Sequence, residues 1–149
     1  MLNSFFLAMA RNPHTVKKAQ KQLDDVLGGE RLPEHSDIDQ LPYIAAIVKE
    51  TLRWSPTDPL GSAHRLMEDD IYKGMFIPAG ATVMENTWSV NSSNQDRMSP
   101  DTSGRGISRD KNIYPDPETF NPERFLTRNG KIDPSVKDPE LMVFGSGRR

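Results

Sequence analysis

The sequence contains no cysteine among its 149 residues. This excludes disulfides, thiol nucleophiles, cysteine zinc sites and thiolate-bound iron supplied by these residues. No charge of one sign dominates either, since 19 Lys and Arg oppose 21 Asp and Glu for a net charge of −2; that balance predicts no nucleic-acid binding. The most apolar stretch, residues 5–10, is far shorter than the ~20 residues of a membrane span, and no basic region precedes it as in a secretory signal.

Two long helices are predicted from apolar residues at helical spacing. Asn12 as N-cap and Pro13 at the first position begin the first helix, and Gly28 ends it with a left-handed cap. The second helix covers residues 43–54 and ends before a proline. Residues 5–10 are predicted to be the last turns of a further, buried helix.

Short strand-like runs replace the helices in the middle of the chain. A two-residue turn at 73–74 predicts a hairpin, while residues 91–106 are polar enough to be a loop. Twelve prolines are well above average usage, and three of them make residues 115–125 an irregular, packed coil. Helices therefore come first, a small antiparallel hairpin sheet next and coil last, so the fold class is α+β and mainly α. Residues 64–66 and 70–72 are predicted to be short strands, and residues 76–83 a strand, a turn and a second strand.

Three motifs carry recognisable chemistry. Glu50 and Arg53 are three residues apart on the second helix and can pair, either as an exposed ion pair or as a buried one with further partners. Arg124 lies in the proline-rich coil, where a fixed guanidinium can reach a carboxylate. The glycine-rich segment 144–149 ends in two arginines and reads either as an anion cradle or as a flexible basic terminus.

These motifs, in this order, resemble the cytochrome P450 superfamily, and specifically the C-terminal part of a fungal microsomal-type P450. Glu50-Thr51-Leu52-Arg53 is similar to the helix K motif, and 122–125, Pro-Glu-Arg-Phe, to the segment whose arginine completes a Glu–Arg–Arg network. Residues 76–80, Phe-Ile-Pro-Ala-Gly, match a family turn between strands. Residues 144–149 are similar to the opening of the haem-binding signature F-x-x-G-x-R-x-C.

The resemblance implies a role for each of these residues. The network of Glu50, Arg53 and Arg124 would be structural rather than catalytic and would lock the coil against helix K. The resemblance also implies haem-binding residues, namely partners for the two haem propionates and a phenylalanine ring packed on the haem face. His64 is the weakest of them, because a plain strand-edge histidine explains it equally well. The implied haem-binding residues are Arg65 and Arg149 at the propionates, Phe144 on the haem face, Gly147 in the signature, and His64.

The implied parent activity is that of a haem-thiolate monooxygenase of the endoplasmic reticulum membrane. It would oxygenate a small apolar molecule with O₂ and electrons from an NADPH-dependent reductase. The sequence departs from the family because it stops at Arg149, two positions before the cysteine that binds iron. The oxygen-side helix would likewise lie upstream of Met1. We therefore expect these residues alone to be inactive and to hold no haem stably. The alternatives are a non-catalytic partner-binding module and a truncated gene product without function.

A polar insert interrupts the resemblance. Residues 1–149 are expected to be one partial P450 domain, but removing 90–106 joins residues 86–89 to 107–110 as continuous family sequence. A retained intron of 17 codons would explain the insert and keep the reading frame. The alternative is a tolerated surface loop, because long loops add little closure entropy.

Overall fold

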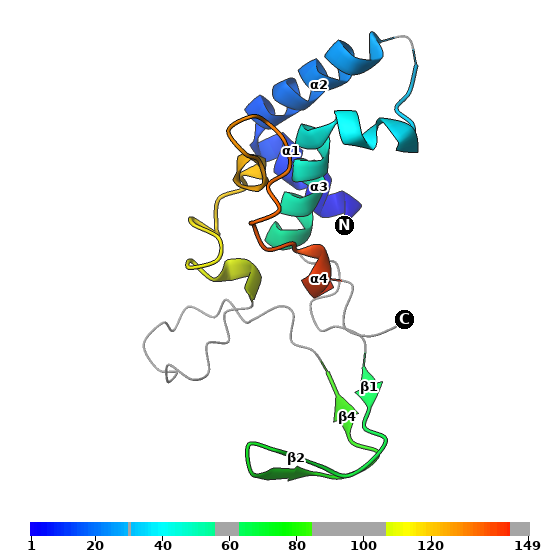
Figure 1. Cartoon of the computed structure of the whole chain (residues 1–149), viewed down its shortest axis with the longest axis vertical. Helices are drawn as coiled ribbons and strands as arrows, with labels where there is room; N and C mark the ends of the chain where they lie inside the picture. The colour runs from blue at the N-terminus through cyan, green and yellow to red at the C-terminus, as the bar shows by residue number, and fades with distance from the viewer. Residues whose placement is uncertain (30, 56–62, 85–106, 144–149) are drawn as a thin grey trace.

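The computed structural model describes residues 1–29, 31–55, 63–84 and 107–143, with the helices gathered at one end and the strands at the other (Figure 1). The predicted α+β, mainly helical class of a partial P450 fold is confirmed. The helices are α1 Leu2–Arg11, α2 Pro13–Leu27, α3 Pro42–Trp54 and α4 Glu140–Val143. Short 3₁₀ helices are η1 His35–Gln40, η2 Ile107–Arg109 and η3 Pro122–Phe125, and the strands are β1 His64–Arg65, β2 Asp70–Tyr72, β3 Met75–Ile77 and β4 Thr82–Val83.

Both predicted long helices are present, with one difference at the first cap. Asn12 occupies the N-cap position of α2, but its side-chain amide donates to the Ala8 carbonyl of α1 at 2.8 Å instead of accepting from the helix. Asn12 therefore fixes the corner between α1 and α2. Gly28 ends α2 in the left-handed region, with φ of 65° and its N–H donating to the Asp24 carbonyl, as predicted.

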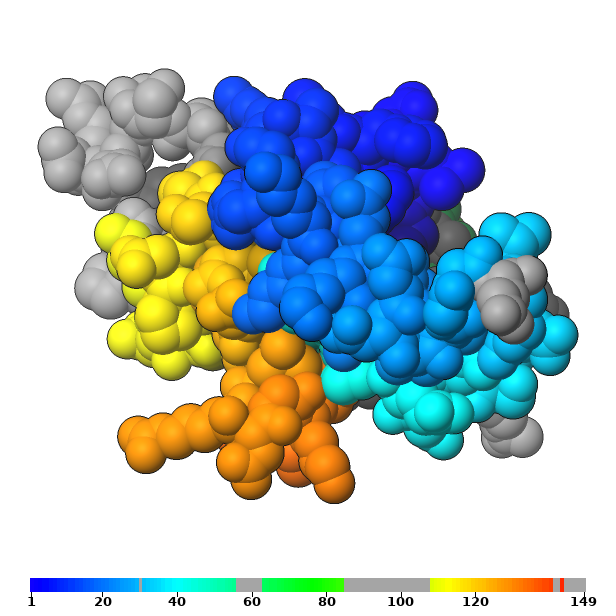
Figure 2. All heavy atoms as spheres, turned by 90° about the horizontal axis from the view of Figure 1, so that it is seen from above, coloured from blue at the N-terminus to red at the C-terminus, as the bar shows by residue number. Residues whose placement is uncertain are grey.

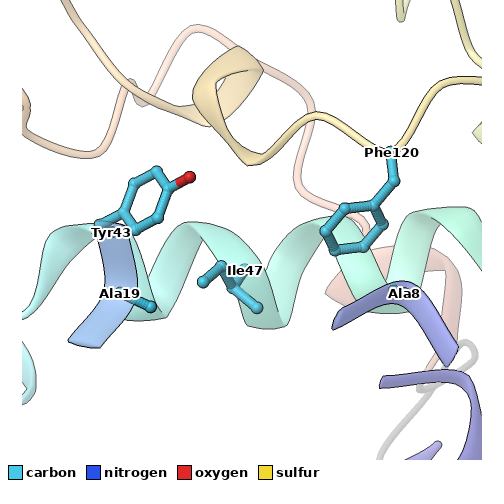
Figure 3. Close-up of a cluster of buried hydrophobic side chains, with 5 residues drawn as sticks. All are labelled: Ala8, Ala19, Tyr43, Ile47 and Phe120. Atoms are coloured by element: carbon cyan, nitrogen blue, oxygen red, sulfur yellow. The ribbon is translucent and has the colours of Figure 1, made fainter. Parts of the chain in front are cut away.

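A hydrophobic cluster joins the first three helices to the coil. Its five buried members come from α1, α2, α3 and the coil (Figure 3). Seen from above, α1 and α2 cover one end of the molecule and the coil lies beside them (Figure 2). The cluster therefore fixes the coil against the helices that precede it in sequence. Its buried members are Ala8, Ala19, Tyr43, Ile47 and Phe120.

The strands form two separate antiparallel pairs. In the outer pair β1 pairs with β4, and in the inner hairpin β2 pairs with β3. Lys73 and Gly74 both have positive φ, 49° and 80°, which is the geometry of a tight hairpin turn and confirms the predicted one. Ile71 and Phe76 face each other across the hairpin but remain 69% and 64% exposed. The described residues thus leave the apolar side chains of this hairpin uncovered.

The coil and the short α4 complete the described fold. Residues 115–125 are irregular and packed, as predicted, and end in η3. The four-residue α4 was not expected from the sequence. The short helix suspected at 86–89 and the insert at 90–106 lie outside the described residues.

Candidate functional site

Helix α3 places a carboxylate and a guanidinium side by side on its buried face. Glu50 and Arg53 are one helical turn apart and both side chains are fully buried. The Arg53 Nε donates to Glu50 Oε2 at 2.7 Å and its Nη2 donates to Glu50 Oε1 at 2.8 Å. This two-pronged geometry is the strong form of an arginine–carboxylate pair, so the buried alternative is the correct one.

The rest of the Arg53 guanidinium is bound by backbone carbonyls. Its Nη1 donates to the carbonyls of Ser108 at 2.8 Å and Pro117 at 2.9 Å, and its Nη2 donates to Thr119 at 3.4 Å. The Tyr114 ring lies 5.5 Å from the guanidinium carbon and adds a cation–π contact. Arg53 therefore joins α3 to η2 and to the coil in one place.

Arg124 brings the second cation to the same carboxylate. Its Nε lies 3.1 Å from Glu50 Oε2, close enough for an ion pair but without the alignment of a hydrogen bond. Its two terminal nitrogens donate to the carbonyls of Pro115 at 2.6 Å, Asp116 at 3.2 Å and Thr119 at 3.1 Å. The structure thus assembles Glu50, Arg53 and Arg124 into one network, as the resemblance implied.

The network closes through a backbone amide of the coil. The Asn121 N–H donates to Glu50 Oε1 at 2.8 Å, so this carboxylate accepts three hydrogen bonds in addition to the Arg124 ion pair. A buried ion pair is stable only when its remaining donors and acceptors are satisfied. Here the donors and acceptors come from α3, η2, η3 and the coil, so the arrangement suits structural locking rather than proton transfer.

The residues predicted to meet an acidic cofactor lie elsewhere in the fold. His64 and Arg65 are exposed on β1, opposite Val83 and Thr82 of β4. The Arg65 guanidinium packs against Gly80, where an added Cβ would sit 3.7 Å from its Nη2. Among the described residues, no ion pair is recorded for this guanidinium. The other predicted members, Phe144, Gly147 and Arg149, lie outside the described residues.

Two residues beside the network were not singled out from the sequence. Tyr114 is fully buried and donates its hydroxyl to the Lys137 carbonyl at 2.6 Å, and burial raises its pKa to about 12. Lys49 precedes Glu50 and forms ion pairs with Asp138 and Glu140. The spacing of residues in the sequence does not predict the contacts of Tyr114 and Lys49. The only available signal is the Asp-Pro-Glu run at 138–140, which is a typical helix start.

Neither a metal cluster nor a membrane helix is found in the described part of the chain. Within those ranges, no three side chains of His, Asp or Glu come together as metal ligands. Of the helices described, none has the length and apolar character needed to cross a membrane.

The order of elements, with a buried Glu–Arg–Arg network locking a proline-rich coil to a helix, defines a known class of protein. The family model for Cytochrome P450 matches residues 1–96 and 102–149, and the chain belongs to this family. It is 45% identical over 148 residues to cytochrome P450 monooxygenase 98 of Postia placenta, with 99% of this chain and 25% of that protein covered. It is 47% identical over 146 residues to cytochrome P450 monooxygenase COX2 of Coprinopsis cinerea, at 98% and 24% coverage.

A third relative has the same relation to the chain. Cytochrome P450 monooxygenase ple1 of Rhodocybe pseudopiperita is 43% identical over 148 residues, which cover 99% of this chain and 25% of that protein. The chain therefore spans about a quarter of the length of the curated relatives that it matches.

Proposed function

We propose that this chain is the C-terminal structural part of a haem-thiolate monooxygenase that oxygenates a small apolar molecule. The observation that carries the proposal is the network of Arg124 with the fully buried Glu50 and Arg53, in a chain that belongs to the P450 family. When bound, a haem with an axial thiolate supplies the oxygen-activating chemistry, with electrons delivered by an NADPH-dependent reductase. We further propose that the full-length protein works at the endoplasmic reticulum membrane, as its resemblance to microsomal-type P450s implies.

Within this function the described residues have a structural or binding role and take no part in the chemical step. The network keeps the coil fixed on α3, and the coil leads through α4 to residues 144–149, the segment similar to the haem-binding signature. Arg65 would bind one haem propionate, and Arg149 the other, with Phe144 and Gly147 beside the haem and His64 as a weaker contact. The exposed guanidinium of Arg65, packed against Gly80 with no ion pair recorded among the described residues, supports this role because a propionate could reach it.

The 149 residues alone contain no cysteine, and we propose that they form no thiolate-ligated haem centre. The test adds haem, dithionite and CO to the purified chain, with no thiolate-type Soret band expected. A thiolate-type band would overturn this part of the proposal. A specific partner captured by a haem-free chain would instead favour the non-catalytic binding module.

The parent function is tested in a protein that supplies the missing residues. We call this protein the grafted relative: it is cytochrome P450 monooxygenase 98 of Postia placenta with the matching 148 residues replaced by this chain. We expect a thiolate-type CO spectrum, and reduced haem retention in the Arg65→Ala variant. Arg128→Ala is the matched control, since Arg128 is also exposed and no partner is recorded for it among the described residues. A graft without the thiolate spectrum, or equal haem loss in both variants, would contradict the assignment.

Residues 90–106 are proposed to be an insert foreign to the enzyme. The family match passes over residues 97–101, which lie inside this segment, and this supports the proposal. Sequencing of the mature transcript is expected to show a dominant message that lacks these 17 codons. A dominant message that retains them would favour a true surface loop.

A further inference from the structure

A second group of contacts on α3 reaches the segment that precedes residues 144–149. The Lys49 side chain is only 17% exposed, and its Nζ forms an ion pair with the Asp138 carboxylate and lies 3.5 Å from Glu140 Oε1. Lys49 is next to Glu50 in sequence but takes no part in the Glu50 network. It therefore connects α3 to a different part of the chain, the start of α4.

Asp138 has two separate bonds at this junction. One carboxylate oxygen faces Lys49, while the other, Oδ1, accepts the Glu140 N–H at 3.0 Å and so caps the first turn of α4. Burial raises the pKa of the Asp138 carboxyl, but hydrogen bonds from Lys49 and the Glu140 N–H outweigh this, so the pKa is below its usual value. The carboxylate is thus held in its charged form.

Helix α4 carries this constraint forward along the chain. The Val143 N–H donates to the Pro139 carbonyl at 3.2 Å and closes the only turn of α4, which ends one residue before Phe144. Just upstream, the Tyr114 hydroxyl holds the Lys137 carbonyl at 2.6 Å. The backbone from 137 to 140 is therefore tied at consecutive points to residues packed on α3.

We propose that Lys49 is a positioning residue for haem binding, acting through Asp138 and α4 on the backbone that enters residues 144–149. The proposal rests on the proposed function for its link to haem, but the contact itself does not. Lys49 touches neither substrate nor cofactor. Its charge fixes where α4 begins, and α4 ends at Val143, directly before the segment 144–149.

The first test uses hydrogen exchange and no haem. In the 149-residue chain, Lys49→Met is expected to speed exchange of the Glu140 and Val143 amides about three- to tenfold, the effect of losing a partly exposed ion pair. Lys17→Met is the matched control, because Lys17 is an exposed helical lysine for which no partner is recorded among the described residues. Lys49→Arg should restore slow exchange. Unprotected α4 amides in the unchanged chain, or equal effects of both methionine variants, would overturn the proposal.

The Asp138→Asn variant distinguishes the ion pair with Lys49 from the hydrogen bond that caps α4. Asparagine still accepts the Glu140 N–H, so any faster exchange reports the lost ion pair. Combined with Lys49→Met it should add little, because both changes remove the same contact. Additive effects would show that Lys49 acts by another route and would overturn the proposal.

The second test measures haem in the grafted relative. We expect Lys49→Met to lower the thiolate-type fraction of the CO spectrum at unchanged protein yield, and Lys49→Arg to recover it. Faster α4 exchange without any spectral change would overturn the positioning role and leave the proposed function intact. A graft that forms no thiolate centre with Lys49 present would instead refute the proposed function, while the exchange test would still judge the contact.

Discussion

Removal of the buried carboxylate is the sharpest test of the network. In Glu50→Leu, the guanidinium of Arg53 loses two hydrogen bonds, Arg124 loses its ion pair and the Asn121 N–H loses its acceptor. Loss of one partner from a buried pair costs about 3–5 kcal/mol, because the other charge stays buried. The Arg109–Glu118 pair provides the control, since the Glu118 carboxylate is 67% exposed and Glu118→Gln should cost less than ~1 kcal/mol.

The Asn121 amide reports this loss directly, because it donates to Glu50 itself. At about 1.36 kcal/mol per tenfold, its hydrogen exchange should speed up by about two to nearly four orders of magnitude, limited by global unfolding. The double variant Glu50→Leu, Arg53→Met should lose less free energy of unfolding than the two single variants summed. The reason is that the double variant no longer buries the unpaired charge of Arg53. Additive costs, or Asn121 exchange no faster than in Glu118→Gln, would refute the reasoning.

Three further predictions concern single side chains. The Thr15 hydroxyl is buried without a hydrogen-bond partner, so Thr15→Val should raise the free energy of unfolding by about 1–2 kcal/mol in urea denaturation, and a lower value would contradict this. Hydrogen bonds from Arg31 lower the pKa of Asp37 to about 2. The stability that this pair contributes should therefore be full above about pH 4 and be lost as the pH falls toward 2. Asp37→Asn should remove this acid dependence when unfolding is measured as a function of pH. Tyr114→Phe leaves the Lys137 carbonyl unbonded and should cost about 1–2 kcal/mol in urea, whereas an unchanged midpoint would show that the bond contributes nothing.

The sequence was sufficient for the long helices α2 and α3 and for the motif pairing but not for α4 or for the contacts that complete the site. Apolar spacing predicted α2 and α3, and the three-residue separation of Glu50 and Arg53 placed both on one helical face. The second cation on the Glu50 carboxylate, Arg124, came from family resemblance, because a separation of 74 residues between Glu50 and Arg124 leaves no local signal. Lys49 and its partner Asp138 were missed for the same reason.

The Asn12 side chain was predicted as a cap and lies instead on the previous helix, at the Ala8 carbonyl. The side-chain amide of an Asn at a helix start can accept a hydrogen bond from the new helix or donate one to a nearby carbonyl. Only the packing of α1 against α2 decides between the two. Local propensity predicted the boundary correctly, whereas the side-chain partner depended on tertiary structure.

The irregular coil follows from the charge imbalance of the network. One buried carboxylate cannot neutralise two guanidinium groups, so their remaining donors need further acceptors. They come from the backbone carbonyls at 108, 115, 116, 117 and 119. In a helix or sheet these carbonyls would be used within the element itself. Prolines at 115 and 117 have no N–H to satisfy, and the positive φ of Asp116, 48°, bends the chain around the Arg124 guanidinium. The high proline content and the missing periodicity of this segment are therefore requirements of the site, because only an irregular backbone can offer so many carbonyls to two buried arginines.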